Sequence, residues 1–258
     1  MENRINILFR EKSSDILNIY FTAGYPELES TGEIIMALDK AGVDMVEIGM
    51  PYSDPLADGP TIQESSSIAL QNGMKLSILF SQIKEVRKQT KMPFILMGYY
   101  NQLLQFGFEK FCYECKSAGV DGLIIPDLPL VNYEKEYIHI LKKYNLRISF
   151  LITPKTHKDR IILIDKLSTS FVYVVSSSSV TGNKLEMEKY NMKYFEEIKN
   201  MNLNNPILIG FGINNKKSFN FACNYANGAI IGSAFIKALS KSKNIHKTAN
   251  QFINSIKE

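Results

Sequence analysis

Eight short apolar runs, recurring about every 25 to 35 residues, constrain the fold of this chain more than any other feature. Most are rich in Ile, Val, Phe or Leu without strict alternation, as expected for parallel strands covered on both faces. We therefore predict eight buried parallel strands. The runs are Leu17–Thr22, Asp44–Gly49, Pro93–Gly98, Gly122–Asp127, Arg147–Ile152, Phe171–Ser176, Pro206–Phe211 and Gly228–Ser233.

Stretches with apolar residues at helical spacing lie between these runs. They include Glu27–Ala41, Ser77–Lys88, Asn132–Tyr144 and Lys189–Asn200, and residues 2–12 predict an extra helix before the first strand. Strands that alternate with helices, without a linker, favour a single (β/α)8 barrel domain over residues 1–258. An open doubly wound sheet is the alternative, but it is disfavoured by the strand number and by the missing Gly-x-Gly-x-x-Gly after the first strand.

The composition argues against several other classes of protein. Thirty basic against 26 acidic residues give a net charge of only +4, without a long run of like charges, which disfavours a nucleic-acid surface. The charged N-terminus does not look like a signal peptide, and no segment approaches the roughly 20 apolar residues that span a bilayer. The three cysteines, Cys112, Cys115 and Cys223, lack a second ligand pair for zinc. We expect buried or half-buried thiols in a cytoplasmic protein.

The segment Val46–Gln63, VEIGMPYSDPLADGPTIQ, holds the first candidate site residues. Glu47 lies inside the second strand, and alternation with its neighbours would turn its side chain into the barrel. Burial would raise its pKa toward a value useful for acid–base catalysis; the alternative is a structural carboxylate paired with Arg or Lys. The following loop, rich in Pro and Gly, can hold Asp58 opposite Glu47 as a second acid–base group. An Asp in a turn also commonly bonds its own backbone, which is the alternative for Asp58.

Glycines at the ends of the last three strands indicate a phosphate site. Backbone N–H groups after the seventh and eighth strands of such barrels often bind phosphate, and glycine lets the backbone approach an anion closely. The candidates are Gly182, Gly212, Gly232 and the hydroxyl of Ser233. We find no metal-ligand spacing, no nucleophile elbow and no strand lysine suited to a Schiff base. The residues alone therefore predict acid–base chemistry on a small phosphate-bearing substrate, without a metal.

The segment EIGMPYSDPLADGPTIQ, within residues 47–63, resembles the signature of the tryptophan synthase alpha subunit family almost letter for letter. Supporting matches occur in the family's order from end to end: YFTAGYP, GVDGLIIPDLP, SVTG, GFGI and GSA. The resemblance implies a (β/α)8-barrel lyase of L-tryptophan biosynthesis. Its reaction would be the retro-aldol cleavage of indole-3-glycerol phosphate to indole and glyceraldehyde 3-phosphate.

The resemblance also implies roles for particular residues. Glu47 would shuttle a proton, Asp58 would accept a hydrogen bond from the indole N–H, and Tyr173 matches the family's active-site tyrosine. Thr181 would close over the substrate and position Asp58. The indole pocket would be lined by Tyr20, Met97, Tyr99, Ile124 and Ile152. The phosphate would be held by Gly182, Phe211, Gly212, Gly232 and Ser233.

The family's partner is a beta subunit, in an α2β2 heterotetramer in which indole passes to a pyridoxal phosphate held by that partner and not by this chain. The resemblance implies that Met50–Thr61 and Ser176–Met187 face the partner. The second loop departs from the family pattern, because Ser177 replaces an arginine and Ser179 a glycine. This departure keeps open a catalytically weak subunit that binds and activates the beta partner. The other alternative is a different phosphate-binding barrel, such as a phosphosugar isomerase or an indole-3-glycerol phosphate synthase. Such enzymes generally use a lysine or histidine at a strand end, and we find none there in this sequence.

Overall fold

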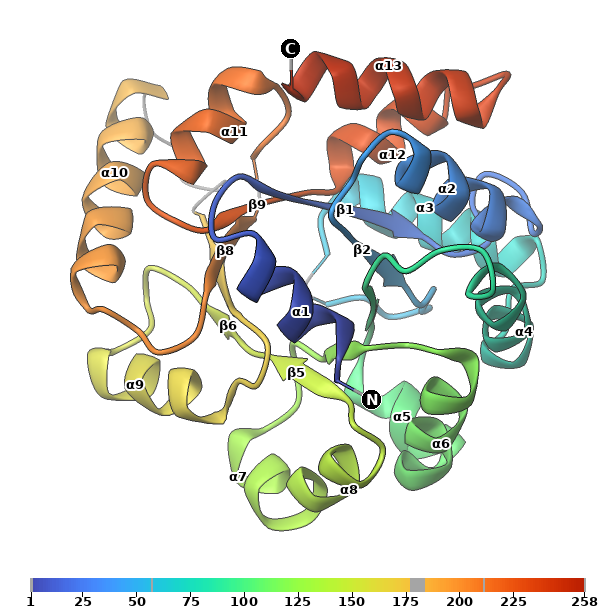
Figure 1. Ribbon diagram of the computed structural model, residues 1–258, viewed down its shortest axis with the longest axis horizontal. Coiled ribbons are helices and arrows are strands. Elements are labelled where there is room, and N and C mark those ends of the chain that lie inside the picture. The colour runs from blue at the N-terminus through green and yellow to red at the C-terminus, as the bar shows by residue number, and fades with distance from the viewer. Residues whose placement is uncertain (1, 57, 177–183, 211, 258) are drawn as a thin grey trace.

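The strands form one parallel sheet that curves into a barrel with helices around it (Figure 1). The computed structural model describes residues 2–56, 58–176, 184–210 and 212–257, with the backbone alone for 184–190. The strands are β1 (Ile16–Thr22), β2 (Met45–Gly49), β3 (Phe94–Met97), β4 (Gly122–Ile124), β5 (Arg147–Ser149), β6 (Leu151–Ile152), β7 (Val172–Val175), β8 (Ile207–Gly210) and β9 (Gly228–Ile231).

The barrel closes through a broken strand. The sheet order is β5-β4-β3-β2-β1-β9-β8-β7-β6, so its two ends, β5 and β6, are separated in sequence by Phe150 alone. Together they occupy the fifth predicted run, 147–152, with β5 paired to β4 and β6 paired to β7. The predicted eight-stranded (β/α)8 architecture is confirmed, and the ninth strand results from this break.

Helices follow the strands around the outside of the barrel. The first half holds α1 (Arg4–Glu11), α2 (Ser30–Lys40), α3 (Pro60–Gln71), α4 (Leu76–Val86), α5 (Tyr100–Phe106) and α6 (Phe108–Ala118). The second half holds α7 (Leu130–Asn132), the π-helix η1 (Tyr133–Tyr137), α8 (Ile138–Lys143), α9 (Lys158–Leu167), α10 (Lys184–Asn200), α11 (Lys216–Cys223), α12 (Ser233–Leu239) and α13 (Ile245–Lys257). Among these helices, none is long and apolar enough to cross a membrane.

Most of the predicted helices are confirmed, including the extra helix before the first strand. The helical prediction over Asn132–Tyr144 is confirmed, and the structure adds a π-helical turn between two short α-helical pieces. Cys112 and Cys115 are buried on α6, and Cys223 is half-buried, as expected for structural thiols.

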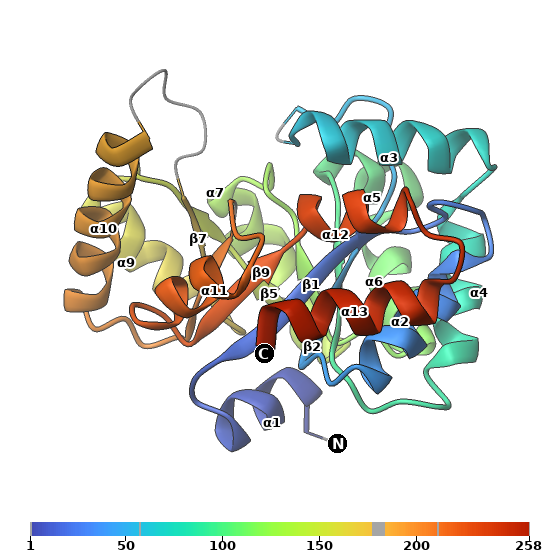
Figure 2. The same cartoon turned by 90° about the horizontal axis from the view of Figure 1, so that it is seen from above.

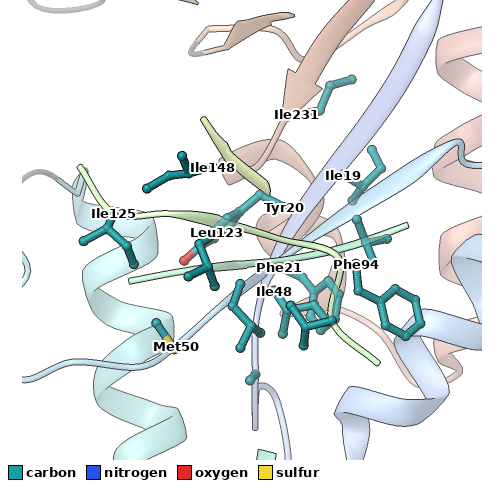
Figure 3. Packing of buried hydrophobic residues seen from close by; sticks show 14 of the residues in the cluster. Ile19, Tyr20, Phe21, Ile48, Met50, Phe94, Leu123, Ile125, Ile148 and Ile231 are labelled. Atoms are coloured by element: carbon teal, nitrogen blue, oxygen red, sulfur yellow. The ribbon is translucent and has the colours of Figure 1, made fainter. Parts of the chain in front are cut away.

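Alternation along the strands separates two apolar layers. One set of side chains points outward and packs against the helices, while the other fills the barrel interior. Figure 3 shows this for β1, where Tyr20 points away from its neighbour Ile19. The interior layer contains Ile16, Met45, Ile95, Ile124, Phe171, Tyr173, Leu208 and Ile230, together with Ile5 of α1.

Helix α1 closes the end of the barrel at which the strands begin. Asp121, which is only 3% exposed, pairs with Arg4 of α1 at 2.8 Å and with Arg87 at 3.6 Å. Asn3 donates hydrogen bonds from its side chain to the backbone oxygens of Asp121 and Asn145, at 2.8 and 2.9 Å. Figure 2 shows α1 at one end of the molecule and α3 at the other. The paired strands are parallel, so their carboxyl ends meet at the end opposite α1, where catalytic groups of such barrels lie.

Candidate active site

Glu47 points into the barrel interior from the middle of β2, as its alternation predicts. It is fully buried, and it pairs in register with Tyr20 of β1 and Ile95 of β3. The side-chain amide of Asn18 donates a hydrogen bond to Glu47 Oε1 at 2.5 Å, whereas Glu47 Oε2 has no partner. Among the described residues, no Arg or Lys forms an ion pair with Glu47. The structure therefore does not support a paired structural carboxylate.

Burial controls the protonation of Glu47. Loss of solvation raises its pKa from the ordinary value of 4.5 to about 8, and the hydrogen bond from Asn18 acts in the opposite direction. A carboxyl group with a pKa near neutrality can both donate and accept a proton at physiological pH. This property suits acid–base catalysis, where an ordinary surface glutamate would be fully ionised.

Asp58 is held at the end of the loop that follows β2. Its Oδ2 accepts a hydrogen bond from the Tyr99 hydroxyl at 3.0 Å, and burial raises its pKa above the ordinary value. Tyr99 stacks on Tyr52 of the same loop, with ring centroids 5.3 Å apart. The loop is also tied to α5, since the Gln102 side chain donates to the Pro51 oxygen at 3.0 Å. These contacts fix the loop and point Asp58 toward a tyrosine instead of leaving it in solvent.

Two further tyrosines, Tyr20 and Tyr173, lie in the barrel beside the carboxyl groups. Both are buried, and desolvation together with the fields of Glu47 and Asp58 raises their pKa values, so both stay neutral. A β-carbon at Gly49 would overlap the Tyr20 ring. A β-carbon at Gly210 would overlap Tyr173 in the same way. The glycines at these strand ends thus make room for the tyrosine rings.

Of the predicted phosphate-binding residues, the structure describes Gly212, Gly232 and Ser233. These three lie at the same end of the barrel as the carboxyl groups. Gly212 follows β8 with φ +77°, a conformation that favours glycine. Gly232 precedes α12, Ser233 begins that helix, and a β-carbon on Gly232 would come within 3.3 Å of Tyr20. The backbone of Gly232 therefore lies close to Tyr20, which is the tyrosine next to the carboxyl groups. Thr181, Gly182 and Phe211 lie outside the described residues, as do Ser177 and Ser179.

The predicted apolar pocket needs one correction. Met97 and Ile124 are register partners on β3 and β4 and belong to the interior layer. Ile152 does not, because it pairs with Val174 and packs in the outer layer against the helices. Leu151 pairs instead with Tyr173 and contacts the interior cluster. The prediction of Ile152 as a pocket residue is therefore wrong, and Leu151 occupies that place.

Comparison with known proteins identifies the family to which this chain is similar. The family model described as "Tryptophan synthase alpha chain" matches residues 8–258. The tryptophan synthase alpha chain of Flavobacterium psychrophilum is 52% identical over 254 residues, which cover 98% of this chain and 99% of the relative. That of Flavobacterium johnsoniae is 55% identical over 240 residues, covering 93% of this chain and 94% of the relative.

The chain belongs to the tryptophan synthase alpha chain family. A solved tryptophan synthase complex from Pyrococcus furiosus contains a chain with a TM-score of 0.85 and 31% identity, covering 95% of this chain and 98% of that one. As a member of the family, this alpha chain is a lyase of tryptophan biosynthesis.

Two contacts of this alpha chain were not predicted from its sequence. Asn18 is fully buried in β1 and binds Glu47, and Asp127 accepts a hydrogen bond from the Tyr100 backbone N–H at 2.8 Å, at the start of α5. For Asn18 a signal existed, because a lone amide interrupts the apolar run LNIYFT on the same face as Tyr20. For Asp127 the partner becomes visible only when the segments after β3 and β4 are placed side by side.

The buried carboxyl group of this alpha chain predicts a stability that falls with pH. The folded pKa of Glu47 is about 8, above its ordinary value of 4.5, so the native state holds this proton more tightly than the unfolded state does. The resulting stabilisation is complete below the unfolded pKa and is lost as pH rises through the folded one. From about pH 5 to pH 8 we expect the stability of wild type relative to Glu47→Gln to fall by on the order of 4 kcal/mol.

Urea unfolding of both proteins across that pH range measures the effect. The other titrating groups are common to the two proteins, so the difference in their free energies of unfolding isolates Glu47. A difference that stays constant over the range would show that Glu47 titrates as an ordinary carboxyl group.

Proposed function

We propose that Glu47 and Asp58 carry the family's lyase reaction in this chain, the cleavage of indole-3-glycerol phosphate to indole and glyceraldehyde 3-phosphate. The observation that carries the proposal is the buried Glu47 carboxyl, which has one oxygen without a partner and acts on the same two tyrosines as a second carboxyl group, Asp58. Asp58 and the buried tyrosines Tyr20 and Tyr173 complete its surroundings. This arrangement suits proton transfer to a substrate that stacks its ring against aromatic and aliphatic side chains.

The cleavage needs two proton transfers and one broken carbon–carbon bond. Neutral Glu47 donates a proton to indole C3, and the positive charge that develops on the ring is stabilised by Asp58 at the ring N–H. The Glu47 carboxylate then removes the proton from the glycerol hydroxyl next to the bond. That oxygen forms the aldehyde, the carbon–carbon electron pair returns to the ring, and indole leaves. Glu47 is protonated again, ready for another cycle.

The remaining site residues would surround the substrate. Tyr20, Met97, Tyr99, Ile124 and Leu151 would line the ring pocket, with Tyr173 at its side. Gly212, Gly232 and Ser233 would bind the phosphate through backbone and hydroxyl donors, where glycine permits close approach. Gly182 and Phe211 are assigned to the phosphate, and Thr181 to closure over the substrate, by resemblance alone.

A beta chain is the partner that we propose for the end of the barrel that holds the carboxyl groups. Leu56, in the loop after β2, is 95% exposed, and Leu104 and Val131, which follow β3 and β4, are 48% and 59% exposed. Leu104 lies on α5 and Val131 on α7, and three large exposed apolar side chains in the segments after successive strands are typical of a protein interface. The solved Pyrococcus furiosus relative is a tryptophan synthase complex, which supports this choice.

We place pyridoxal phosphate in the beta partner, because Glu47 supplies both proton transfers in the cleavage proposed for this chain. We also propose a cytoplasmic location, supported by the three free thiols of the described structure. The alternative of a catalytically weak activator rests on Ser177 and Ser179, where the family has arginine and glycine. The intact carboxyl groups favour the lyase.

Indole release from indole-3-glycerol phosphate, measured with and without a beta chain, tests the proposed function. We expect cleavage by the isolated chain that rises when the partner is added. The same substrate without its phosphate should react with a much higher KM, because the glycine end of the site would be empty. Absence of cleavage in both states, with activation of the beta chain retained, would identify the chain as a structural activator.

A further inference from the structure

Asn18 is a polar side chain in a part of the barrel that is otherwise apolar. It is fully buried on β1, and its register partners are Met45 of β2 and Ile230 of β9. Burying an amide among apolar side chains costs free energy unless it forms hydrogen bonds. Packing alone would be served at least as well by an aliphatic residue, so the amide requires another explanation.

The partner of this amide is Glu47. Asn18 Nδ2 donates to Glu47 Oε1 at 2.5 Å, while Glu47 Oε2 and Asn18 Oδ1 are buried without a partner. We propose that Asn18 is a positioning residue for Glu47, holding one carboxyl oxygen in place and leaving the other for the substrate. The inference rests on the proposed function, in which Glu47 transfers the proton.

The strand register gives this contact a direction. Glu47 is level with Tyr20 of β1, and Asn18 lies two residues earlier on the same strand. Asn18 therefore approaches the carboxyl group from the end of the barrel that α1 closes. The substrate enters from the opposite end, where the loops carry Asp58 and the glycines. Asn18 thus holds the carboxyl group from the α1 side of the barrel and leaves Oε2 without a partner.

An amide is the side chain that suits a carboxyl group whose protonation changes during a reaction. Its N–H groups donate to an ionised Glu47, and after a half-turn its carbonyl oxygen accepts from a protonated one. A lysine or arginine would favour the ionised form, and an aliphatic residue would favour the neutral form. Asn18 can support both forms in the same place.

The other groups near Glu47 are tyrosines and a second carboxyl group. Tyr20 of β1 and Tyr173 of β7 lie near the carboxyl group, and Asp58, which is bonded to Tyr99, lies near the same two tyrosines. In the described structure, none of these groups is a cation. Burial raises the pKa of Glu47, and the hydrogen bond from Asn18 lowers it. Loss of the amide should raise that pKa further and free the carboxyl group to rotate.

Asn18→Val and Asn18→Thr form a matched pair of variants, because their side chains have nearly the same shape but only threonine keeps a hydroxyl. Infrared titration would follow the carboxyl band of Glu47, identified by its absence from Glu47→Gln. For Asn18→Val we expect a titration midpoint higher by about one pH unit. We expect kcat for indole release to fall about 10-fold or more, with KM changed far less. Threonine should restore part of both effects.

The outcomes separate this inference from the proposed function. If Asn18→Val titrates and turns over like wild type, Asn18 only fills space, and the inference is wrong. Equal losses in the valine and threonine variants would also overturn it, since bulk and not hydrogen bonding would then matter. Full activity in Glu47→Gln would refute the proposed function even where the Asn18 variants shift the titration. Circular dichroism establishes that each variant is folded.

Discussion

Replacing Glu47 with Gln should lower kcat for indole release by about 10³- to 10⁴-fold while leaving the fold intact. Glutamine keeps the size of the side chain and a hydrogen-bonding group for Asn18, but it can neither donate nor accept the proton in the cleavage. In the proposed reaction this one carboxyl group acts in both proton transfers, so its loss affects both steps. The measurement is steady-state indole release by the variant in the presence of a beta chain.

A matched control is available on the surface. Glu85 is an exposed glutamate whose side chain pairs with Lys88 at 3.0 Å, and Glu85→Gln should leave kcat unchanged. A retained activity in Glu47→Gln within tenfold of wild type would move the acid–base role to another group. The Glu47→Gln protein should also unfold at a higher urea concentration at alkaline pH, since it lacks the buried carboxylate.

Replacing Asp58 with Asn should lower kcat by about 10²-fold or more. Asparagine is nearly isosteric and can still accept a hydrogen bond from Tyr99, but it lacks the negative charge that stabilises the cationic ring. Since the charge acts mainly on the intermediate, KM should change much less than kcat. Single-turnover and steady-state assays with saturating substrate measure this difference.

Two further variants define what Asp58 contributes. Tyr99→Phe removes the 3.0 Å hydrogen bond but keeps the stacked ring, so we expect a loss of only several-fold in kcat. Asp159→Asn, an exposed position on α9, should have no effect. If Asp58→Asn changes KM and kcat equally, Asp58 binds the substrate in its ground state and does not act on the cationic intermediate.

The positions that could be predicted from the sequence are those with local causes. Side chains alternate across a strand with a period of two, so VEIG alone turns Glu47 inward and its neighbours outward. The eight apolar runs with helices between them leave few ways to bury a parallel sheet, and this predicts the barrel. The order of the strands then brings Glu47, Tyr173 and the late glycines to the same end of the molecule.

The sequence left other features open because they depend on distant segments. In the run RISFLI, Leu151 shares a face with Arg147 and Ser149, and Ile152 shares the other face with Ile148 and Phe150. This pattern does not say which face lines the barrel, and pairing with β7 shows that Leu151 faces inward and Ile152 outward. The break at Phe150 is likewise a result of barrel closure. The fold also decides that the amide of Asn18 meets Glu47, since β1 and β2 are separated in sequence by α2. Residue types and their local period thus determined the architecture and the chemical groups. Tertiary structure decided their partners and protonation, because burial and cross-strand contacts exist only once the barrel has closed.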